Sequence, residues 1–397
     1  MCHDALKVHV NSMISLVLPT YNESASIAAV LYRAASAFAA AREQFELIVV
    51  DDSSPDGTAD IAEKLSCELP VRVLRRSGRK GLASAVVEGW KAAQGDVIGV
   101  MDADLQHPPE ALTKLLAAIR HSGVDIAIAS RTADGGGSPN WSPLRQFVSW
   151  TAKHLAASFL PFTLAGINDS MSGMFLLKSE VLKGIVLEPQ GYKILLEVLA
   201  KGRYQRLVEV PYTFAPRDRG SSKLGARQTL EYFLHLAQLA FITKQFETWL
   251  CYALVGFSGA SIHLACLLFL VTNAHWPLTL ALVSAIQVAL LNNFLWNRHV
   301  TFRRLPHVGS IAAGERMRLG LARFEAVCIP GAVLNSMLTT ILLRFGGSLL
   351  LAASAGVILG GVWNLFFNVP AIWRSSISPD IVGQFAPAPS IENPRVS

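Results

Sequence analysis

The stretch Val100-Met101-Asp102-Ala103-Asp104-Leu105-Gln106, followed by His107-Pro108-Pro109, places two carboxylates and an amide at alternate positions directly after an apolar run. Strand side chains alternate between faces, so Asp102, Asp104 and Gln106 share one face if the strand continues. Neighbouring negative groups repel unless a cation lies between them. A hard divalent ion accepts such oxygen ligands and completes its shell with phosphate oxygens and water. The stretch predicts a cation site with a diphosphate beside it.

An Asp-x-Asp pair taken alone has an alternative interpretation, as two solvated acids in a surface loop. Its position after a buried strand favours the cation site. On both sides of it, from residue 12 to about 212, short β-branched runs alternate with helical patterns. Strands that are apolar on both faces, each followed by a helix, predict an α/β domain with a mostly parallel sheet.

Three of the predicted strands end in polar clusters, at residues 19–23, 51–54 and 102–104. Ligands of open α/β sheets bind at the carboxyl ends of strands, so the site is expected there. Tyr21 could stack on a base or ribose, while Glu23, Asp51 and Asp52 could accept hydrogen bonds from the nucleoside. The second cluster also fits a turn and helix N-cap.

Basic residues should stand opposite the diphosphate to share its charge. Candidates are Arg131, which ends the next strand, and Arg217 and Lys223 in a Gly-Ser-Ser stretch that could close as a loop. For the last two, a basic patch that attracts anionic lipid is the alternative. The run at residues 72–81, RVLRRSGRKG, is interpreted as a solvated or lipid-facing patch with only Arg79 and Lys80 near the site. No G-x-G-x-x-G or P-loop motif follows the first strand, which argues against a dehydrogenase and a P-loop NTPase.

The second half of the chain changes to long apolar segments. Over the whole sequence 51% of residues are hydrophobic and 16% are charged, which is too apolar for an ordinary soluble protein. Segments 249–271, 277–296, about 322–343 and about 349–370 are each near the roughly 20 residues that cross a bilayer. Four spans are therefore predicted.

The arginine-rich segment between the second and third spans contrasts with the first connection, which has no Lys or Arg. The positive-inside rule then places this segment, the N-terminal domain and the C-terminus in the cytoplasm of a multi-pass cell-membrane protein. The polar N-terminus lacks the pattern of a secretory signal. Five cysteines without a CxxC spacing suggest neither a disulfide framework nor zinc.

The segment that links the two halves carries apolar residues at the spacing of one helical face: Leu230, Phe233, Leu234, Ala237 and Phe241. A helix on the membrane surface is expected. Polar residues within the spans are interpreted first as contacts that hold helices together, with a path for a lipid phosphate as the alternative. They are Asn292, Asn293, Asn297, Asn335, Asn364 and Asn368, and His263 is expected to be packed or paired.

Several motifs together resemble a known family. PTYNE, VVDDSSPDGT, MDADLQHPPE, IASR, DSMSGMF, GYKILLEVL and RDRGSSKL, in this order and spacing, are similar to family 2 glycosyltransferases of the GT-A fold, specifically the dolichyl or polyprenyl phosphate mannosyltransferases. VGFSGASIHL and LLNNFLWNRHVTF resemble the GtrA-like four-helix membrane domain. The resemblance extends to about residue 374 and implies a GT-A domain at 1–225 and a transmembrane domain at 247–375, with the expected interface helix at 226–246 between them. The Pro- and Ser-rich composition of residues 376–397 predicts a disordered tail.

The resemblance implies an inverting transfer of mannose from GDP-mannose to a polyprenyl or dolichyl phosphate, with Mg²⁺ or Mn²⁺ as cofactor and no nucleic acid as partner. Asp102, Asp104 and Gln106 would hold the metal, and Asp104, Arg131 and Asp169 are the implied catalytic residues. Residues implied to contact the nucleotide sugar are Pro19, Tyr21, Glu23, Val50, Asp51, Asp52, Asp102, Ala103, Asp104, Gln106, Arg131, Arg217 and Lys223. The family commonly has Asp-Pro where this chain has Asp169-Ser170, so the acceptor side is less defined.

A phosphate acceptor simplifies the expected mechanism, because a phosphate monoester with a second pKa near ~6 is already mostly dianionic at neutral pH. No general base is required. Alternatives that stay open are UDP-glucose or another nucleotide sugar as donor, and a membrane domain that moves the lipid-linked sugar across the bilayer. A processive polysaccharide synthase is disfavoured, because no Gln-x-x-Arg-Trp motif occurs.

Overall fold

The computed structural model describes residues 13–78, 81–121, 123–139, 141–188, 193–215, 226–301 and 313–368. These residues form two compact units. The first comprises residues 13–148 and 167–239, and the second comprises 149–166 and the described part of 240–378.

A seven-stranded mixed sheet forms the centre of the first unit. Its strands are β1 (Met13–Thr20), β2 (Gln44–Asp51), β3 (Val71–Arg75), β4 (Val97–Met101), β5 (Ile126–Ser130), β6 (Met174–Lys178) and β7 (Leu207–Pro211). The spatial order is β3-β2-β1-β4-β6-β5-β7. Only β6 runs antiparallel to its neighbours, β4 and β5. The mostly parallel sheet expected from the sequence is confirmed.

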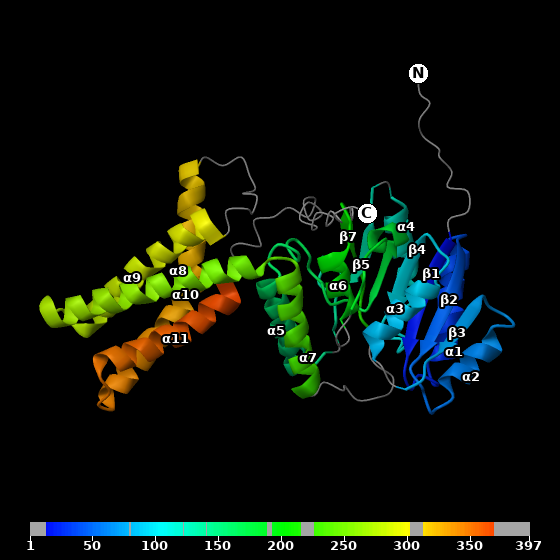
Figure 1. Ribbon diagram of the computed structural model, residues 1–397, viewed down its shortest axis with the longest axis horizontal. Helices are drawn as coiled ribbons and strands as arrows, with labels where there is room; N and C mark the ends of the chain where they lie inside the picture. The colour runs from blue at the N-terminus through cyan, green and yellow to red at the C-terminus, as the bar shows by residue number, and fades with distance from the viewer. Residues whose placement is uncertain are drawn as a thin grey trace, which may run out of the picture. The chain divides into compact units, whose positions relative to one another are not determined.

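Helices cover both faces of this sheet, as Figure 1 shows. They are α1 (Ile27–Ala40), α2 (Thr58–Leu65), α3 (Leu82–Ala92), α4 (Ala111–Arg120) and α6 (Ile194–Lys201), with a 3-10 turn η1 at Ser179–Leu182. Alternate residues of β1 explain the two layers. Leu16 and Leu18 belong to the core that contains residues of α1 and α4, whereas Val17 lies beside Gly89 of α3. Both faces are thus buried, and the open edge of the carboxyl ends is left for ligands.

The second unit is mainly helical and consists largely of apolar helices. They are α8 (Phe246–Leu268), which continues into the π-helical turn η2 (Phe269–Asn273), α9 (Leu278–Trp296), which continues into η3 (Asn297–Thr301), α10 (Ala313–Arg344) and α11 (Leu349–Asn368). Among the described residues three helical segments are long and apolar enough to cross a membrane: Phe246–Asn273, Leu278–Thr301 and Gly320–Arg344. α11 is also apolar and lies where the fourth span is expected, but its segment Leu349–Asn364 is shorter than these three, so a fourth crossing stays a prediction.

Two further helices have amphipathic surfaces. α5 (Pro143–Phe159) was not expected from the sequence, and α7 (Ala226–Ile242) begins at the start of the expected linking helix. In α7, Tyr232, Leu236 and Leu239 are buried. The residues of the expected apolar face are all exposed: Leu230, Phe233, Leu234, Ala237 and Phe241.

Candidate active site

A cavity of ≈ 220 Å³ lies at the carboxyl ends of β1, β2 and β4. The parallel pairing of β1 with both other strands brings these ends to one edge, although they are far apart in the sequence. The residues that line it are Pro19, Thr20, Tyr21, Glu23, Asp52, Gly81, Leu82, Ala85, Asp102, Ala103 and Asp104. Seven of the expected site residues therefore converge on one cavity: Pro19, Tyr21, Glu23, Asp52, Asp102, Ala103 and Asp104.

The acidic pair follows β4 directly. Ala103 between the two aspartates is buried, and the turn that comes next has Leu105 at φ 60°, so the chain leaves the strand direction there. One oxygen of Asp104, Oδ1, accepts a hydrogen bond from the Gln106 backbone N–H at 3.1 Å. Gln106 is buried and its backbone carbonyl accepts from Ala215 N at 2.9 Å. Gln106 is not among the residues that line the cavity.

Asp102 is oriented by a buried pair that the sequence did not reveal. His107 Nε2 lies 3.5 Å from Asp102 Oδ2, and His107 Nδ1 lies 2.9 Å from the Tyr212 hydroxyl. The two rings stack with their centroids 5.4 Å apart. Burial raises the pKa of Tyr212, so its hydroxyl keeps its proton and can donate it to Nδ1. With Nδ1 beside the Tyr212 hydroxyl, Nε2 is the ring nitrogen that lies near Asp102.

A glycine permits this arrangement. A Cβ at Gly173 would overlap Asp102 Oδ2 and would lie 2.9 Å from His107 Nε2. Any larger residue would have to displace the carboxylate. Gly173 belongs to the DSMSGMF segment, which connects to β6, the antiparallel neighbour of β4.

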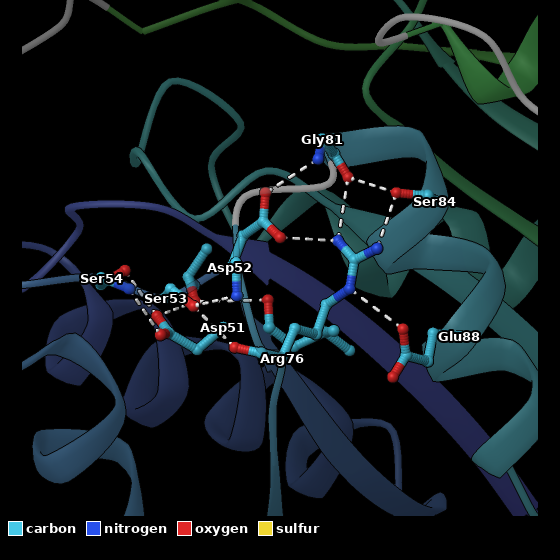
Figure 2. Close-up of polar contacts among 11 residues, drawn as sticks. Asp51, Asp52, Ser53, Ser54, Arg76, Gly81, Ser84 and Glu88 are labelled. Atoms are coloured by element: carbon cyan, nitrogen blue, oxygen red, sulfur yellow. Dashed lines mark hydrogen bonds and ion pairs between the residues drawn. The ribbon is translucent and has the colours of Figure 1, made fainter.

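Figure 2 shows how Asp52 is held. Arg76 Nη1 donates to Asp52 Oδ1 at 2.8 Å, and the Gly81 backbone N–H donates to Oδ2 at 2.8 Å. Arg76 also donates to the Gly81 carbonyl, to Ser84 Oγ and to Glu88 Oε2. Asp52 and Arg76 thereby fix the start of α3 at the cavity wall. The expected solvated basic patch is wrong for Arg76, whose side chain is only 2% exposed.

Two other residues expected at the nucleoside lie elsewhere. Asp51, the last residue of β2, is buried, accepts hydrogen bonds from Thr20 Oγ1 and Ser54 Oγ, and is not among the residues that line the cavity. Val50 is completely buried and lies beside Gly89 of α3. Its position in the sheet core separates its side chain from the cavity. Arg217, Lys223, Arg79 and Lys80 lie outside the described residues.

Arg131, expected as a cation for the phosphate groups, and Asp169, expected on the acceptor side, form a buried ion pair. The guanidinium donates to Asp169 through Nη2 at 2.7 Å and Nε at 2.8 Å, and the Arg131 backbone N–H donates at 3.0 Å. Burial alone would raise the pKa of Asp169, but the hydrogen bonds and charge of Arg131 outweigh it and lower the pKa. Asp169 therefore stays ionised and positions the guanidinium, which also lies over the rings of Trp141 and Phe214.

Lys193 is a second cation at this place that sequence reasoning did not single out. Its Nζ donates to the Met171 carbonyl at 3.2 Å. Burial and the nearby Arg131 lower its pKa to about 8, while Asp102 and Asp169 act in the opposite direction. Lys193, Arg131, Asp169 and Asp102 thus form one electrostatic cluster. Only its position after the GY of GYKILLEVL could have pointed to it.

Comparisons with known proteins agree with this architecture. Residues 15–185 match the family described as glycosyl transferase family 2, and residues 251–373 match the GtrA/DPMS transmembrane domain. A dolichol-phosphate mannosyltransferase of Pyrococcus furiosus is 40% identical over 362 residues, which cover 91% of this chain and 99% of that relative.

Two further relatives match a smaller part of this chain. A dolichol-phosphate mannosyltransferase of Saccharomyces cerevisiae is 35% identical over 236 residues, 57% of this chain and 86% of the relative. An undecaprenyl-phosphate mannosyltransferase of Micrococcus luteus is 36% identical over 219 residues, 52% of this chain and 86% of the relative.

The GT-A-like sheet and its cavity, joined to apolar membrane helices, define a family 2 glycosyltransferase that is a membrane protein. Within this class, the likeness over nearly the whole length of the archaeal relative is decisive. The chain belongs to the dolichol-phosphate mannosyltransferase family.

Proposed function

We propose that the protein transfers mannose from GDP-mannose to the phosphate of a polyprenyl lipid, with inversion at the anomeric carbon. The observation that carries this proposal is the convergence of Tyr21, Glu23 and Asp52 with the acidic pair Asp102 and Asp104 in one cavity. Beside it, Arg131 and Lys193 supply positive charge. The first three residues could contact a nucleoside, the acidic pair could bind a diphosphate through a cation, and the two basic residues could bind an anionic acceptor.

The acidic pair fits a divalent cation such as Mg²⁺ or Mn²⁺. Both carboxylates line the cavity, and the side chain of Asp102 is 32% exposed although His107 orients it from behind. No group of three or more His, Cys, Asp or Glu side chains suited to a metal occurs in the described part of the chain. Asp102 and Asp104 would therefore share the ion with diphosphate oxygens and water, and with Gln106 if its side chain turns toward them. Such an ion would stabilise the negative charge of the departing diphosphate.

The reaction is written as a single displacement. An oxygen of the acceptor phosphate forms a bond to the anomeric carbon, the bond from that carbon to the diphosphate oxygen breaks, and its electron pair leaves with the nucleoside diphosphate. No proton has to move, because the acceptor is already mostly dianionic at neutral pH. The protein's task is to hold two anions in line and to offset their repulsion.

Arg131 and Lys193 perform this task on the acceptor side. The guanidinium of Arg131 is fixed by Asp169 through two hydrogen bonds, so it loses little freedom when it binds phosphate. Asp169 acts as a positioning residue. Arg217 and Lys223 remain predicted diphosphate contacts outside the described residues.

Because the proposed acceptor is a lipid, the enzyme is expected to act at a membrane. In this proposal the catalytic domain, residues 1–225, and the C-terminus lie in the cytoplasm, and the helix at 226–246 lies on the membrane surface. The exposed apolar side chains of α7 support that placement, because they would be buried in lipid. The membrane domain, 247–375, tethers and orients the enzyme, and the tail is 376–397.

A panel of labelled nucleotide sugars tests the donor. Purified full-length protein is incubated with polyprenyl phosphate and GDP-mannose, UDP-glucose or another nucleotide sugar, and the lipid product is analysed. We expect mannosyl lipid from GDP-mannose; preferential transfer from UDP-glucose would select the alternative donor.

Removal of metal tests the acidic pair. EDTA should abolish turnover and Mn²⁺ should restore it, whereas Asp104→Ala should stay inactive when Mn²⁺ is added. Undiminished transfer by a folded variant with both aspartates neutralised would contradict the proposal.

A further inference from the structure

One short segment, residues 169–171, holds both cations proposed for the acceptor phosphate. Asp169 accepts two hydrogen bonds from the guanidinium of Arg131, at 2.7 and 2.8 Å, and one from the Arg131 backbone N–H at 3.0 Å. Two residues further on, the Met171 carbonyl accepts from Lys193 Nζ at 3.2 Å. A displacement of this segment would therefore move both basic groups at once.

The segment is buried although it belongs to no helix or strand. Asp169, Ser170 and Met171 are 3%, 1% and 6% exposed. A buried loop needs partners for its backbone N–H and C=O groups, because an unpaired group away from water costs stability. On its C-terminal side the chain enters β6 at Met174, which pairs with Met101 of β4. The N-terminal side of the segment lies outside the sheet and needs a different anchor.

Glu209 of β7 is that anchor. Its Oε1 accepts from the Asp169 backbone N–H at 2.7 Å, and its Oε2 accepts from the Asn168 backbone N–H at 2.8 Å. Successive backbone N–H groups that converge on one carboxylate form a strong anion-binding arrangement. Glu209 itself pairs with Ile128 of β5, so the sheet fixes the backbone from which its side chain extends.

Only a carboxylate can accept both of these hydrogen bonds. Each of its oxygens takes one N–H, whereas a carboxamide has one accepting oxygen and an NH₂ group that would face the second donor. Without the pair of bonds, the backbone at Asp169 is free to shift. Its side chain, which is bonded to Arg131 at three points, would shift with it.

We infer that Glu209 is a positioning residue for the acceptor site: by holding the backbone of residues 168 and 169, it sets where Arg131 and Lys193 meet the acceptor phosphate. The inference rests on the proposed function for the identity of the acceptor. It gives Glu209 no contact with either substrate. The donor side should be spared, because the acidic pair follows β4 directly and the β4–β6 pairing anchors the chain beside it.

Equilibrium binding of radiolabelled farnesyl phosphate to the full-length protein in nanodiscs measures the acceptor site without turnover. Glu209→Met should weaken this binding about tenfold or more, the equivalent of one lost hydrogen bond to a charged group. Glu209→Gln, which keeps one accepting oxygen, should bind with an affinity between those of Glu209→Met and the unmodified protein. The affinity for GDP with Mn²⁺, measured on the same samples, should be unchanged.

The direction of the change separates positioning from simple electrostatics. A carboxylate near the site repels an anionic acceptor, so removal of its charge alone would tighten the binding of farnesyl phosphate. Weaker binding by Glu209→Gln therefore requires that the basic groups have moved. This milder variant also decides the question if Glu209→Met does not fold.

Asp125→Asn is the matched control. Asp125 directly precedes β5, at the end of that strand remote from Arg131. Its Oδ2 likewise holds two successive backbone N–H groups, those of Gln205 at 2.8 Å and Arg206 at 3.1 Å. The substitution should lower the unfolding midpoint, as Glu209→Gln should, yet leave the affinity for farnesyl phosphate unchanged.

Unchanged or tighter binding of farnesyl phosphate by both Glu209 variants would overturn the inference. An equal loss in Asp125→Asn, or a parallel loss of GDP binding, would overturn it as well, because either result would indicate general damage to the fold. Absence of binding to the unmodified protein would also overturn it. Failure of the proposed function would instead appear as binding of farnesyl phosphate without transfer of mannose to a polyprenyl phosphate.

Discussion

Gly173 shows how a single missing side chain can set the position of a charged group 71 residues away in sequence (173 against 102). The carboxylate of Asp102 occupies the space that a Cβ at Gly173 would need. Gly173→Ala should therefore displace Asp102 from His107. The affinity for the divalent ion should fall about 10–100-fold, as is usual when a residue that supports a metal ligand is changed. The measurement is turnover against Mn²⁺ concentration.

Gly137→Ala is the control for this prediction, because its added Cβ would meet only Pro139 Cδ at 3.8 Å. We expect the Gly137→Ala curve to follow the unmodified protein. A Gly173→Ala enzyme with the same Mn²⁺ dependence as the unmodified protein would contradict the role given to Asp102.

Lys193 should define the alkaline limit of activity. Its pKa is lowered to about 8, so the ammonium that we propose to face the acceptor phosphate is present below that pH and is lost as the pH rises through it. The kcat/KM for polyprenyl phosphate should fall above about pH 8, because this parameter reports the free enzyme.

Lys193→Arg should move that alkaline limit to higher pH, since arginine stays charged. Lys193→Met should lower kcat/KM below about pH 8, where the unmodified protein carries the ammonium, and should remove the titration. An alkaline limit that is identical in all three proteins would assign it to another group.

Only some of the site residues could be identified from the sequence. Asp102, Asp104, Tyr21 and Asp52 are recognisable because each follows a strand, and parallel strands bring their ends together. His107, Tyr212 and Lys193 lie at the same place through packing between distant segments. No local pattern distinguishes such residues from ordinary core and surface positions.

At the scale of the element, the connection from β3 to α3 depends on Arg76. Its buried side chain donates four hydrogen bonds, to Asp52, Gly81, Ser84 and Glu88, and the Gly81 backbone N–H donates a further one to Asp52. Breaking a buried ion pair by removing one partner usually costs about 3–5 kcal/mol, so Arg76→Met should strongly lower the unfolding midpoint of the protein in detergent.

Arg75 is the neighbouring control. It forms ion pairs with Asp60 and Glu63, but its side chain is 49% exposed. Arg75→Met should cost only about 0–1 kcal/mol, as is typical of exposed ion pairs. Equal shifts of the unfolding midpoint for the two variants would show that Arg76 does not organise the start of α3.

The exposed apolar face of α7 predicts a dependence on the acceptor's environment. Leu230, Phe233 and Leu234 are 58%, 44% and 52% exposed. If they insert into lipid, replacing Leu230 and Leu234 by Glu should reduce transfer to a long polyprenyl phosphate in vesicles. Transfer to a short, water-soluble acceptor should stay unchanged, and an equal loss with both acceptors would indicate damage to the fold instead.

Element types were predictable where apolar periodicity is strong, and less so elsewhere. β1, β2 and β4 are buried on both faces and read as continuous apolar runs. β6 breaks the parallel order, because its direction is set by the route the chain takes through residues 131–173. α5 lies on that route, and its apolar residues Leu144 and Phe147 are exposed and not part of the sheet core.

At the scale of the whole molecule, the acceptor joins the two units functionally. A polyprenyl phosphate has its charge at the membrane surface and its chain in the bilayer, whereas the donor is soluble. A catalytic unit covalently joined to membrane helices therefore meets its lipid substrate at a high effective concentration. The strands of the catalytic unit all precede α8 in the chain, so the side on which this unit lies does not depend on how many helices cross after it.

Crossing by α8, α9, α10 and α11 makes a definite topological prediction. The connection at His275 follows one crossing and that at Phe345 follows three, so both should lie on the side opposite the catalytic unit.

Single-cysteine proteins in sealed vesicles test this with a membrane-impermeant thiol reagent. The native Cys67, which is exposed in the first unit, reports the catalytic side, and His275→Cys and Phe345→Cys report the connections. Ser375→Cys, which follows the fourth helix in sequence, should label together with Cys67. Labelling of His275→Cys from the same side as Cys67 would contradict a spanning α8, and labelling of Ser375→Cys with the connections would leave only three crossings.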